Sequence, residues 1–159
     1  GLYWEKNYLK REYISTKTVN YRITPQGVKR KNYLLITYMR ELLELYQIAK
    51  NHVGKFLINL TNKGYTNILL YGAGEVAETI IGVIRDKDFS SLKVAAVVDD
   101  NKDKQGKTIL GYNVISRNEI EKYAHDAIII TTYAFEEDIV NRLKEMKYPM
   151  DRVEKFFGV

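Results

Sequence analysis

One stretch of this chain, residues 68–77, constrains its fold more than any other. It reads Ile-Leu-Leu-Tyr-Gly-Ala-Gly-Glu-Val-Ala, in which four largely apolar residues lead into two glycines that stand two positions apart. An amphipathic run follows, with apolar residues at Ala77, Ile80, Ile81 and Ile84 that fall on one face of a helix. The order predicts a buried strand, a tight turn and a helix, which is the repeating unit of an α/β sheet.

The glycines of this turn have the spacing of a nucleotide-binding loop. Gly72-x-Gly74-x-x-Ala77 matches the G-x-G-x-x-A pattern that opens a Rossmann-type domain. Gly72 would allow the sharp turn, Gly74 would let a pyrophosphate approach the backbone, and Ala77 would let the helix pack closely on the strand. The start of the helix would supply free N–H groups and a positive dipole for an anion. The expected cofactor-binding residues of the turn are Gly72, Ala73, Gly74, Glu75 and Val76.

Further apolar patterns continue the alternation of strands and helices. Strands are expected at residues 93–98 and 127–131, with a last short strand around Val153 and Phe156. Helices are expected at residues 116–123 and 135–147, and residues 103–115 predict a loop or hairpin that leads into a short strand. Residues 66–159 therefore predict a small parallel sheet of the Rossmann type, with helices on both faces.

An acidic pair follows the second apolar run. Asp99 and Asp100 come directly after residues 93–98, and Asp99 lies 25 residues after Gly74. Rossmann-type domains place an acid near this point, where it accepts hydrogen bonds from a ribose. An acid there disfavours a 2′-phosphate, so NAD or a nucleoside diphosphate fits better than NADP. The alternative is that the pair only ends a strand with turn-forming residues.

The third apolar run ends in Thr131, Thr132 and Tyr133. The carboxyl ends of parallel strands lie along one edge of a sheet, and ligands bind at that edge. We therefore expect these three residues to lie near Gly72 and Gly74 and to belong to the same binding site.

The first part of the chain predicts a hairpin followed by a helix. Two β-like runs, residues 11–14 and 19–23, flank the polar connection at residues 15–18. Thr24 can cap a helix with its side-chain oxygen, and Pro25 suits the first helical turn. A long helix is expected from about residue 28 to residue 60, with a candidate break at Gly54.

The long helix carries a broad apolar face. Steps of three and four residues define a coiled-coil-like seam, and further apolar residues widen it. The seam consists of Leu35, Tyr38, Leu42, Leu45, Ala49, His52 and Phe56, and the widening residues are Leu34, Leu43, Tyr46, Val53, Leu57 and Leu60. We expect a homodimer through this helix, and the alternative is a helix that packs only within its own chain.

A polar linker at residues 61–66 marks the expected domain boundary. The expected domains are a hairpin at 1–27, the long linking or dimerisation helix at 28–60 and the Rossmann-like domain at 66–159.

The charge differs between the two parts of the chain. Residues 1–65 carry 12 Lys and Arg against 4 Glu, whereas residues 66–159 carry 13 Lys and Arg against 16 Asp and Glu. This asymmetry favours a polyanion partner for the first part, and the alternative is a basic surface that only faces solvent.

Composition limits the chemistry and the location. The chain has no cysteine, and its two histidines have no ligand partners at metal spacing, so no metal site is expected. No apolar run approaches the roughly 20 residues that span a bilayer. We expect a cytoplasmic protein that makes no membrane contact.

The segment Tyr-Arg-Ile-Thr-Pro-Gln-Gly-Val-Lys-Arg-Lys, residues 21–31, resembles the end of the winged-helix domain in MarR-like bacterial transcriptional regulators. The resemblance covers roughly residues 8–50 and implies a basic wing followed by a long helix. In that family a helix-turn-helix precedes the wing, and only about a dozen residues precede it here. The chain is either a fragment without its recognition helix or not a reader of DNA. The cations that would contact DNA phosphates are Lys10, Arg11, Lys17, Arg22, Lys29, Arg30 and Lys31.

Residues 66–157 resemble two groups of Rossmann-type domains. The order Gly-x-Gly, Val-Val-Asp-Asp, Lys-x-Gly-Lys-x-Ile-x-Gly-Tyr-x-Val and Asp-Ala-Ile-Ile-Ile-Thr carries the resemblance. One group is the CoA-binding-type domain of the redox-sensing Rex repressors. The other is the N-terminal domain of enzymes that make and modify nucleotide sugars for polysaccharides. The resemblance implies NAD, CoA or a nucleoside diphosphate-sugar as the ligand, and it does not reach residues 1–60.

No set of residues in the sequence predicts catalysis. There is no Ser/Cys–His pairing, no metal-ligand set and no Tyr/Lys pair placed after the glycine turn, so we assign no catalytic residue and expect a binding protein rather than an enzyme. The preferred hypothesis is a ligand-responsive transcriptional regulator with a nucleotide-sensing domain. The alternatives are a non-regulatory Rossmann domain of nucleotide-sugar or polysaccharide metabolism, and a dimerisation domain whose glycine turn binds nothing.

Overall fold

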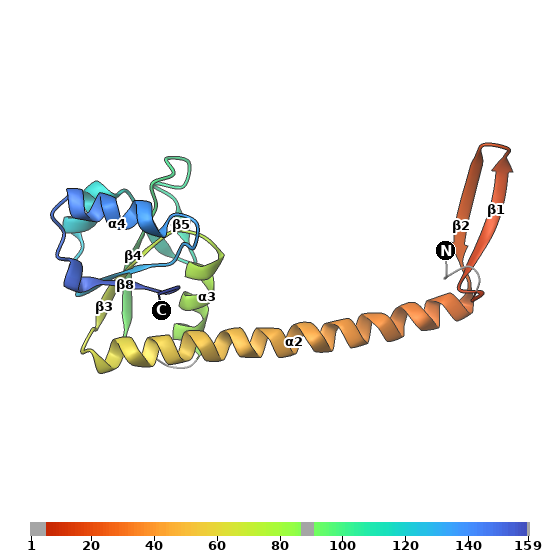
Figure 1. Cartoon of the computed structure of the whole chain (residues 1–159), viewed down its shortest axis with the longest axis horizontal. Coiled ribbons are helices and arrows are strands. Elements are labelled where there is room, and N and C mark those ends of the chain that lie inside the picture. The colour runs from red at the N-terminus through yellow and green to blue at the C-terminus, as the bar shows by residue number, and fades with distance from the viewer. Residues whose placement is uncertain (1–5, 87–90, 159) are drawn as a thin grey trace. The chain divides into compact units, whose positions relative to one another are not determined.

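The computed structural model of the chain describes residues 6–86 and 91–158 (Figure 1). Residues 1–5, 87–90 and 159, which the expected domains include, lie outside the described residues. The chain divides into two compact units, residues 1–49 and residues 50–159. We refer to them as the hairpin unit and the sheet unit.

The hairpin unit contains the two strands that the sequence predicts. Strand β1 (Leu9–Ser15) pairs antiparallel with β2 (Thr18–Ile23), with a bulge before Ser15. Helix α2 (Pro25–Asn62) follows at once and starts three residues earlier than expected. The predicted cap is confirmed, because Thr24 Oγ1 accepts a hydrogen bond from the N–H of Gly27 at 3.0 Å.

The first turn of α2 lies directly against the start of the hairpin. The N–H of Thr24 donates to the carbonyl of Tyr8 at 3.1 Å, and the Thr24 hydroxyl donates to the carbonyl of Asn7 at 2.7 Å. A Cβ at Gly27 would lie only 1.9 Å from the Tyr8 carbonyl oxygen. Only glycine therefore fits at this position, and the hairpin is fixed to the helix at its base.

Helix α2 continues through Gly54 without interruption, so the break considered at that position is wrong. Its last turns also lie in a different unit from the one that the polar linker suggests. Val53, Leu57 and Leu60 are buried in the core of the sheet unit, and the division between the units falls between Ala49 and Lys50. The linker at residues 61–66 marks where the helix ends, at Asn62.

The sheet unit is a six-stranded sheet in the order β5-β6-β4-β3-β7-β8. All neighbouring strands are parallel except the short β5–β6 hairpin. The strands are β3 (Asn67–Tyr71), β4 (Lys93–Val98), β5 (Thr108–Ile109), β6 (Tyr112–Ile115), β7 (Ala127–Ile130) and β8 (Val153–Lys155). The expected strands at residues 68–71, 93–98 and 127–131, and the one near Val153, are confirmed.

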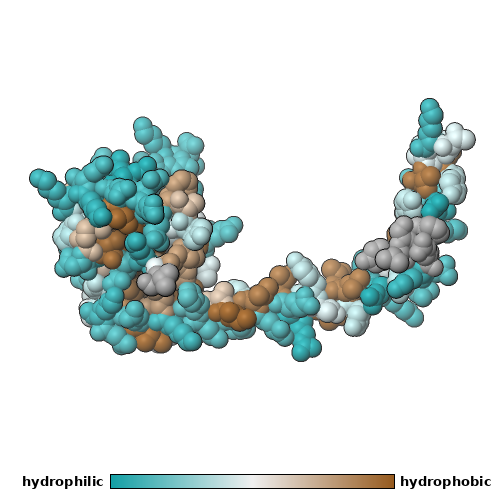
Figure 2. Space-filling model, viewed as in Figure 1, coloured by the Kyte–Doolittle hydropathy of each residue, from teal (hydrophilic) through white to brown (hydrophobic). Residues whose placement is uncertain are grey.

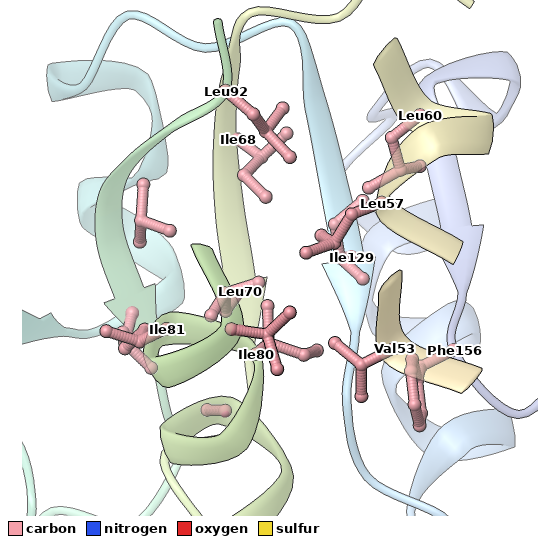
Figure 3. Close-up of a cluster of buried hydrophobic side chains, with 14 of the residues drawn as sticks. Val53, Leu57, Leu60, Ile68, Leu70, Ile80, Ile81, Leu92, Ile129 and Phe156 are labelled. Atoms are coloured by element: carbon pink, nitrogen blue, oxygen red, sulfur yellow. The ribbon is translucent and has the colours of Figure 1, made fainter. Parts of the chain in front are cut away.

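Helices cover both faces of this sheet, which confirms the predicted α/β fold class. One core contains side chains of α3 (Glu75–Asp86) and of the end of α2, as Figure 3 shows for Ile80, Ile81 and Leu57. The core on the other face contains Ile139 and Leu143 of α4 (Glu136–Glu145) and Ile120 of η1 (Arg117–Lys122). A short 3₁₀ turn, η2 (Met150–Arg152), precedes β8.

The segment expected to be a helix at residues 116–123 is a 3₁₀ helix of six residues. Its cap follows the sequence signal, since the N–H of Ser116 donates to Glu119 Oε2 at 3.0 Å. These contacts lower the pKa of Glu119, chiefly through the hydrogen bond from the Ser116 backbone.

Within residues 6–86 and 91–158, no helix combines the length and the apolar character that crossing a membrane requires.

Candidate functional site

A pocket of about 390 Å³ lies at the carboxyl ends of β3, β4 and β7. The glycine turn between β3 and α3 forms one wall, and the start of α4 forms another. We call it the turn pocket. It is lined by Tyr71, Gly72, Ala73, Gly74, Asp99, Asp100, Asn101, Lys104, Thr132, Phe135, Asp138, Ile139 and Arg142.

Gly72 is required by the tight approach of two strand ends. Its φ of +123° is strained for any residue with a side chain. A Cβ there would lie 2.4 Å from Thr132 Cγ2 and 2.7 Å from Thr131 Oγ1. The buried Thr131 hydroxyl lies within 3.0 Å of the Tyr71 carbonyl and 2.9 Å of the Gly72 carbonyl. The residues that follow β3 and β7 are therefore packed closely against each other and joined by hydrogen bonds.

Gly74 stands in a different environment. Apart from Gly74 itself and its two chain neighbours, no heavy atom of the described residues lies within 4 Å of the position that a Cβ would take there. Helix α3 begins at the next residue, and the first N–H groups of a helix have no partner within it. An anion can therefore approach the backbone over Gly74, as the sequence pattern predicts for a phosphate.

Asp99 binds the glycine turn itself. Its Oδ2 accepts a hydrogen bond from the N–H of Ala73 and its Oδ1 accepts one from the N–H of Asn101, both at 2.8 Å. The Lys104 ammonium donates to the Ala73 carbonyl at 2.9 Å and lies 3.8 Å from the Asp99 carboxylate. Asp99 and Lys104 thus hold the turn from the β4 side, whereas the sequence suggested Asp99 as a ribose ligand.

Asp100 is the centre of a second polar network of the turn pocket. Its Oδ2 accepts hydrogen bonds from the Tyr71 hydroxyl at 2.8 Å and from Arg142 Nη1 at 2.5 Å. The Arg117 guanidinium lies 3.8 Å from Oδ1. Burial raises the pKa of Tyr71, and the hydrogen bond to Asp100 raises it further. Tyr71 is therefore a neutral hydrogen-bond donor at any physiological pH.

The same network joins the turn pocket to a smaller cavity of about 290 Å³. We call this cavity the side pocket. It shares Asp100 and Arg142 with the turn pocket and is lined by Asp100, Lys102, Gln105, Ser116, Arg117, Asn118 and Arg142. Together the two pockets contain both cations and carboxylates, so they suit a ligand that carries anionic groups as well as hydroxyl groups.

The sequence-predicted residues fall into three groups in the structure. Those that line the turn pocket are Gly72, Ala73, Gly74, Asp99, Asp100 and Thr132. Thr131 is buried beneath the turn. Glu75 is exposed on the first turn of α3, and Val76 packs against the hydrophobic core. Tyr133 is exposed and its ring meets that of Phe157 at 5.6 Å, so these last three do not line the pocket.

Several pocket residues were not predicted from the sequence. They are Tyr71, Asn101, Lys104, Phe135, Asp138, Ile139 and Arg142. Ile139 and Arg142 are three residues apart, so the helical period places them on one face of α4, and Phe135 is the residue that precedes the helix. The sequence pattern of that helix indicated only its apolar face, so it did not predict Arg142 as a pocket residue. Thr132 Oγ1 is buried and has no hydrogen-bond partner within the described part of the chain.

The candidate DNA-contacting cations all lie in the hairpin unit. Lys10 and Arg22 face each other across the hairpin. Arg22 pairs with Glu12 at 3.0 Å, and Arg11 donates to the Tyr13 hydroxyl at 3.1 Å. Lys17 lies in the connection between the strands. The remaining cations, Lys29, Arg30 and Lys31, are exposed near the start of α2.

In the described residues no three or more His, Cys, Asp or Glu side chains are grouped so that they could hold a metal ion. In the turn pocket, the side chains of Asp99, Asp100, Lys104 and Arg142 bind one another and the backbone.

Residues 64–154 match the family described as C2185-like, N-terminal. The match covers more than half of the chain and includes all the residues that line the turn pocket. The match does not extend into the hairpin unit, and its description names neither MarR-like nor Rex-type proteins, so both resemblances stay expectations. No match to a curated protein was found.

Proposed function

We propose that this chain, which belongs to the C2185-like, N-terminal family, is a ligand-responsive transcriptional regulator that senses a nucleotide in its turn pocket. In this proposal the sheet unit binds the nucleotide and the basic hairpin unit contacts DNA phosphates. Such a regulator acts in the cytoplasm.

The observation that carries the proposal is the open backbone at Gly74 beside a pocket with cationic side chains. The space over Gly74 is empty, the N–H groups at the start of α3 are adjacent, and Lys104 and Arg142 line the same pocket. A phosphate group bound there receives backbone hydrogen bonds, the positive end of the helix dipole and a nearby cation. These are the features that phosphate sites in α/β proteins share.

The acidic residues of the pocket favour a nucleotide over inorganic phosphate. Asp138 and Asp100 line the pocket beside the cations, and carboxylates accept hydrogen bonds from the hydroxyl groups of a sugar. Phe135 adds an apolar surface against which a ring can pack. A nucleoside diphosphate, its sugar derivative, NAD or CoA combines all three chemistries.

The arrangement supports binding rather than catalysis. Tyr71 stays protonated because its pKa is raised, and its hydroxyl donates to Asp100. Asp99 is held by two backbone N–H groups and Lys104 donates to a carbonyl. Each of these groups has a structural partner, so we give none of them the role of acid, base or nucleophile.

The proposal for DNA rests on the charge of the hairpin unit. Of the seven candidate cations, six are exposed, and they lie on both strands, in the turn between them and at the start of α2. Contacts of this kind are made to phosphates and weaken as salt rises. A DNA-binding constant that does not change with salt would exclude them, and would favour a non-regulatory role in nucleotide-sugar metabolism.

Calorimetric titration with a panel of ligands tests the nucleotide proposal. The panel contains NAD, NADH, CoA, UDP, a UDP-sugar and inorganic pyrophosphate. We expect at least one nucleotide to bind, and to bind more tightly than pyrophosphate because the sugar and ring add contacts. Lys104→Ala is expected to weaken that binding about tenfold, which corresponds to the loss of one charge-assisted hydrogen bond. No heat of binding with any member of the panel would refute the proposal.

A further inference from the structure

The first half of helix α2 exposes an unusual number of large apolar side chains. Between residues 33 and 48 there are eleven: Tyr33, Leu34, Leu35, Ile36, Tyr38, Met39, Leu42, Leu43, Leu45, Tyr46 and Ile48. Figure 2 shows apolar side chains along this part of the helix. The second half of the same helix, by contrast, buries Val53, Leu57 and Leu60 in its own sheet unit. The first half has the same apolar character and no core of its own.

The exposed residues form two parallel seams rather than one. The first seam consists of Leu35, Tyr38, Leu42 and Leu45, and the second consists of Ile36, Met39 and Leu43. Both follow steps of three and four residues, and they are offset by one residue. One residue corresponds to about 100° around a helix, so the two seams face in different directions. The side chains of both seams are between 45 and 69% exposed.

A single neighbouring helix covers only one such seam. In a two-stranded coiled coil each helix buries its a and d positions, and the flanking positions carry charges that face solvent. Here the flanking positions include Met39 and Ile48, which are exposed and apolar. Full burial of the apolar face therefore needs two neighbouring helices for each α2.

The area is that of a real interface. At roughly 50–100 Å² for each partly exposed apolar side chain, eleven of them offer on the order of 800 Å². Shared between two neighbours, this surface lets each copy bury in total about as much as one partner buries in a stable two-protein complex. The apolar surface also continues beyond the helix. A groove of about 370 Å³ lined by Leu9 and Ile23 of the hairpin shares Leu34, Leu35 and Tyr38 with the helix face.

We propose that the two seams of α2 bind two neighbouring copies of this chain, so that the α2 segments of at least three copies form a bundle. The spacing of the seams favours further copies of the same chain as the binding partners. Each seam has the spacing of a self-complementary coiled-coil face, and identical chains bring identical spacing. This inference is independent of the nucleotide proposal, because no residue of either pocket in the sheet unit takes part.

Sedimentation equilibrium of the full chain and three variants tests the bundle. Leu42→Glu places a charge in the first seam and Leu43→Glu places one in the second. Thr37→Glu adds the same charge on the polar side of the helix, which also carries Arg40, Glu41 and Glu44, and is the control. All three positions lie outside the core of the sheet unit, so the thermal unfolding of that unit reports correct folding of each variant.

The wild-type chain of 18.5 kDa and Thr37→Glu are expected to have the mass of three or more chains. Leu42→Glu and Leu43→Glu are each expected to reduce that mass. A wild-type dimer would show that the second seam is not covered by a further copy and would overturn the proposal. A wild-type monomer, or an assembly that either seam variant leaves intact, would overturn it as well.

Discussion

At the scale of single residues, Gly72 and Gly74 occupy one turn for different physical reasons. Gly72 has a positive φ and touches the side chains of Thr131 and Thr132, whereas Gly74 faces open space. The first glycine is therefore a requirement of the fold, and the second leaves room for a ligand. The sequence pattern predicted both, although it could not show which atoms exclude a side chain at Gly72.

Substituting alanine at the two positions separates these roles. We expect Gly72→Ala to reduce the free energy of unfolding by about 2–4 kcal/mol, because the added Cβ overlaps Thr132 in a packed turn and the φ is strained. Gly74→Ala is expected to change it by less than about 0.5 kcal/mol. Urea denaturation of both variants measures the difference. Equal losses would mean that the turn is not held as the structure places it.

Asp126 fixes the beginning of β3 through one carboxylate oxygen. Its Oδ2 accepts hydrogen bonds from the N–H groups of Thr66 and Asn67, at 2.7 and 2.8 Å, and from the Thr66 hydroxyl at 2.9 Å. The backbone hydrogen bonds from Asn67 and Thr66 lower the pKa of Asp126 below its ordinary value of 3.8. A carboxylate with a lowered pKa adds stability above its unfolded-state pKa and loses it as the pH falls through its folded-state pKa.

The Asp126→Asn variant tests this contribution. At about pH 6 we expect a loss on the order of 1 kcal/mol in the free energy of unfolding, since the site is partly exposed to solvent. Near pH 2 the loss is expected to shrink, because the wild-type carboxyl is then protonated too. Urea denaturation at both pH values gives the comparison. A difference that stays constant across this range would show that the charge of Asp126 is not the cause.

The residues of the turn pocket show what a sequence can and cannot reveal. The glycine spacing and Asp99 are local signals, and they pointed to the edge of the sheet at which the turn pocket lies. The role of Asp99 was not visible, because its partner is the backbone N–H of Ala73, 26 residues earlier in the chain. Arg142 was missed for the same reason. It meets Asp100 only after α4 has packed on the sheet.

At the scale of elements, helix α2 shows why domain boundaries are hard to predict. The strands β1 and β2 and the start of α2 were evident from apolar runs and from the cap at Thr24. These signals involve only a few neighbouring residues. The apolar period continues across Ala49 and Lys50 without a change, and the only composition signal is the polar stretch at residues 61–66. The boundary depends on which turns of the helix are buried in a hydrophobic core. Tertiary packing decides this.

Two fragments test the assignment of these last turns. Residues 50–159 are expected to unfold cooperatively on heating, since they retain the whole core. Residues 66–159 lack Val53, Leu57 and Leu60, and removing a buried side chain of this size costs about 2–5 kcal/mol each. That sum is comparable to the whole stability of a domain, so the shorter fragment is expected to show no cooperative transition. Equal thermal midpoints would contradict the placement of these turns in the core.

At the scale of the whole molecule, two kinds of surface are combined in one chain. The hairpin unit carries an excess of cations and an apolar helix face, and the sheet unit carries a pocket with an open backbone. A regulator needs both a ligand site and a surface that acts on its target. The glycine turn is the part of this proposal that is most directly accessible to experiment.

Thermal unfolding of three proteins with and without nucleotide tests the site. The proteins are the wild-type chain, Gly74→Val and Gly82→Val. Gly82 lies in α3 outside the pocket lining, and a Cβ there also meets no atom within 4 Å. The two valine variants therefore differ mainly in whether the added side chain stands over the ligand site.

A nucleotide present at 100 times its Kd is expected to raise the stability of the wild type and of Gly82→Val by about 2.7 kcal/mol. The same nucleotide is expected to leave Gly74→Val unchanged, because the valine side chain occupies the space above the turn. An equal stabilisation of Gly74→Val, or none for the wild type with any nucleotide, would contradict the account.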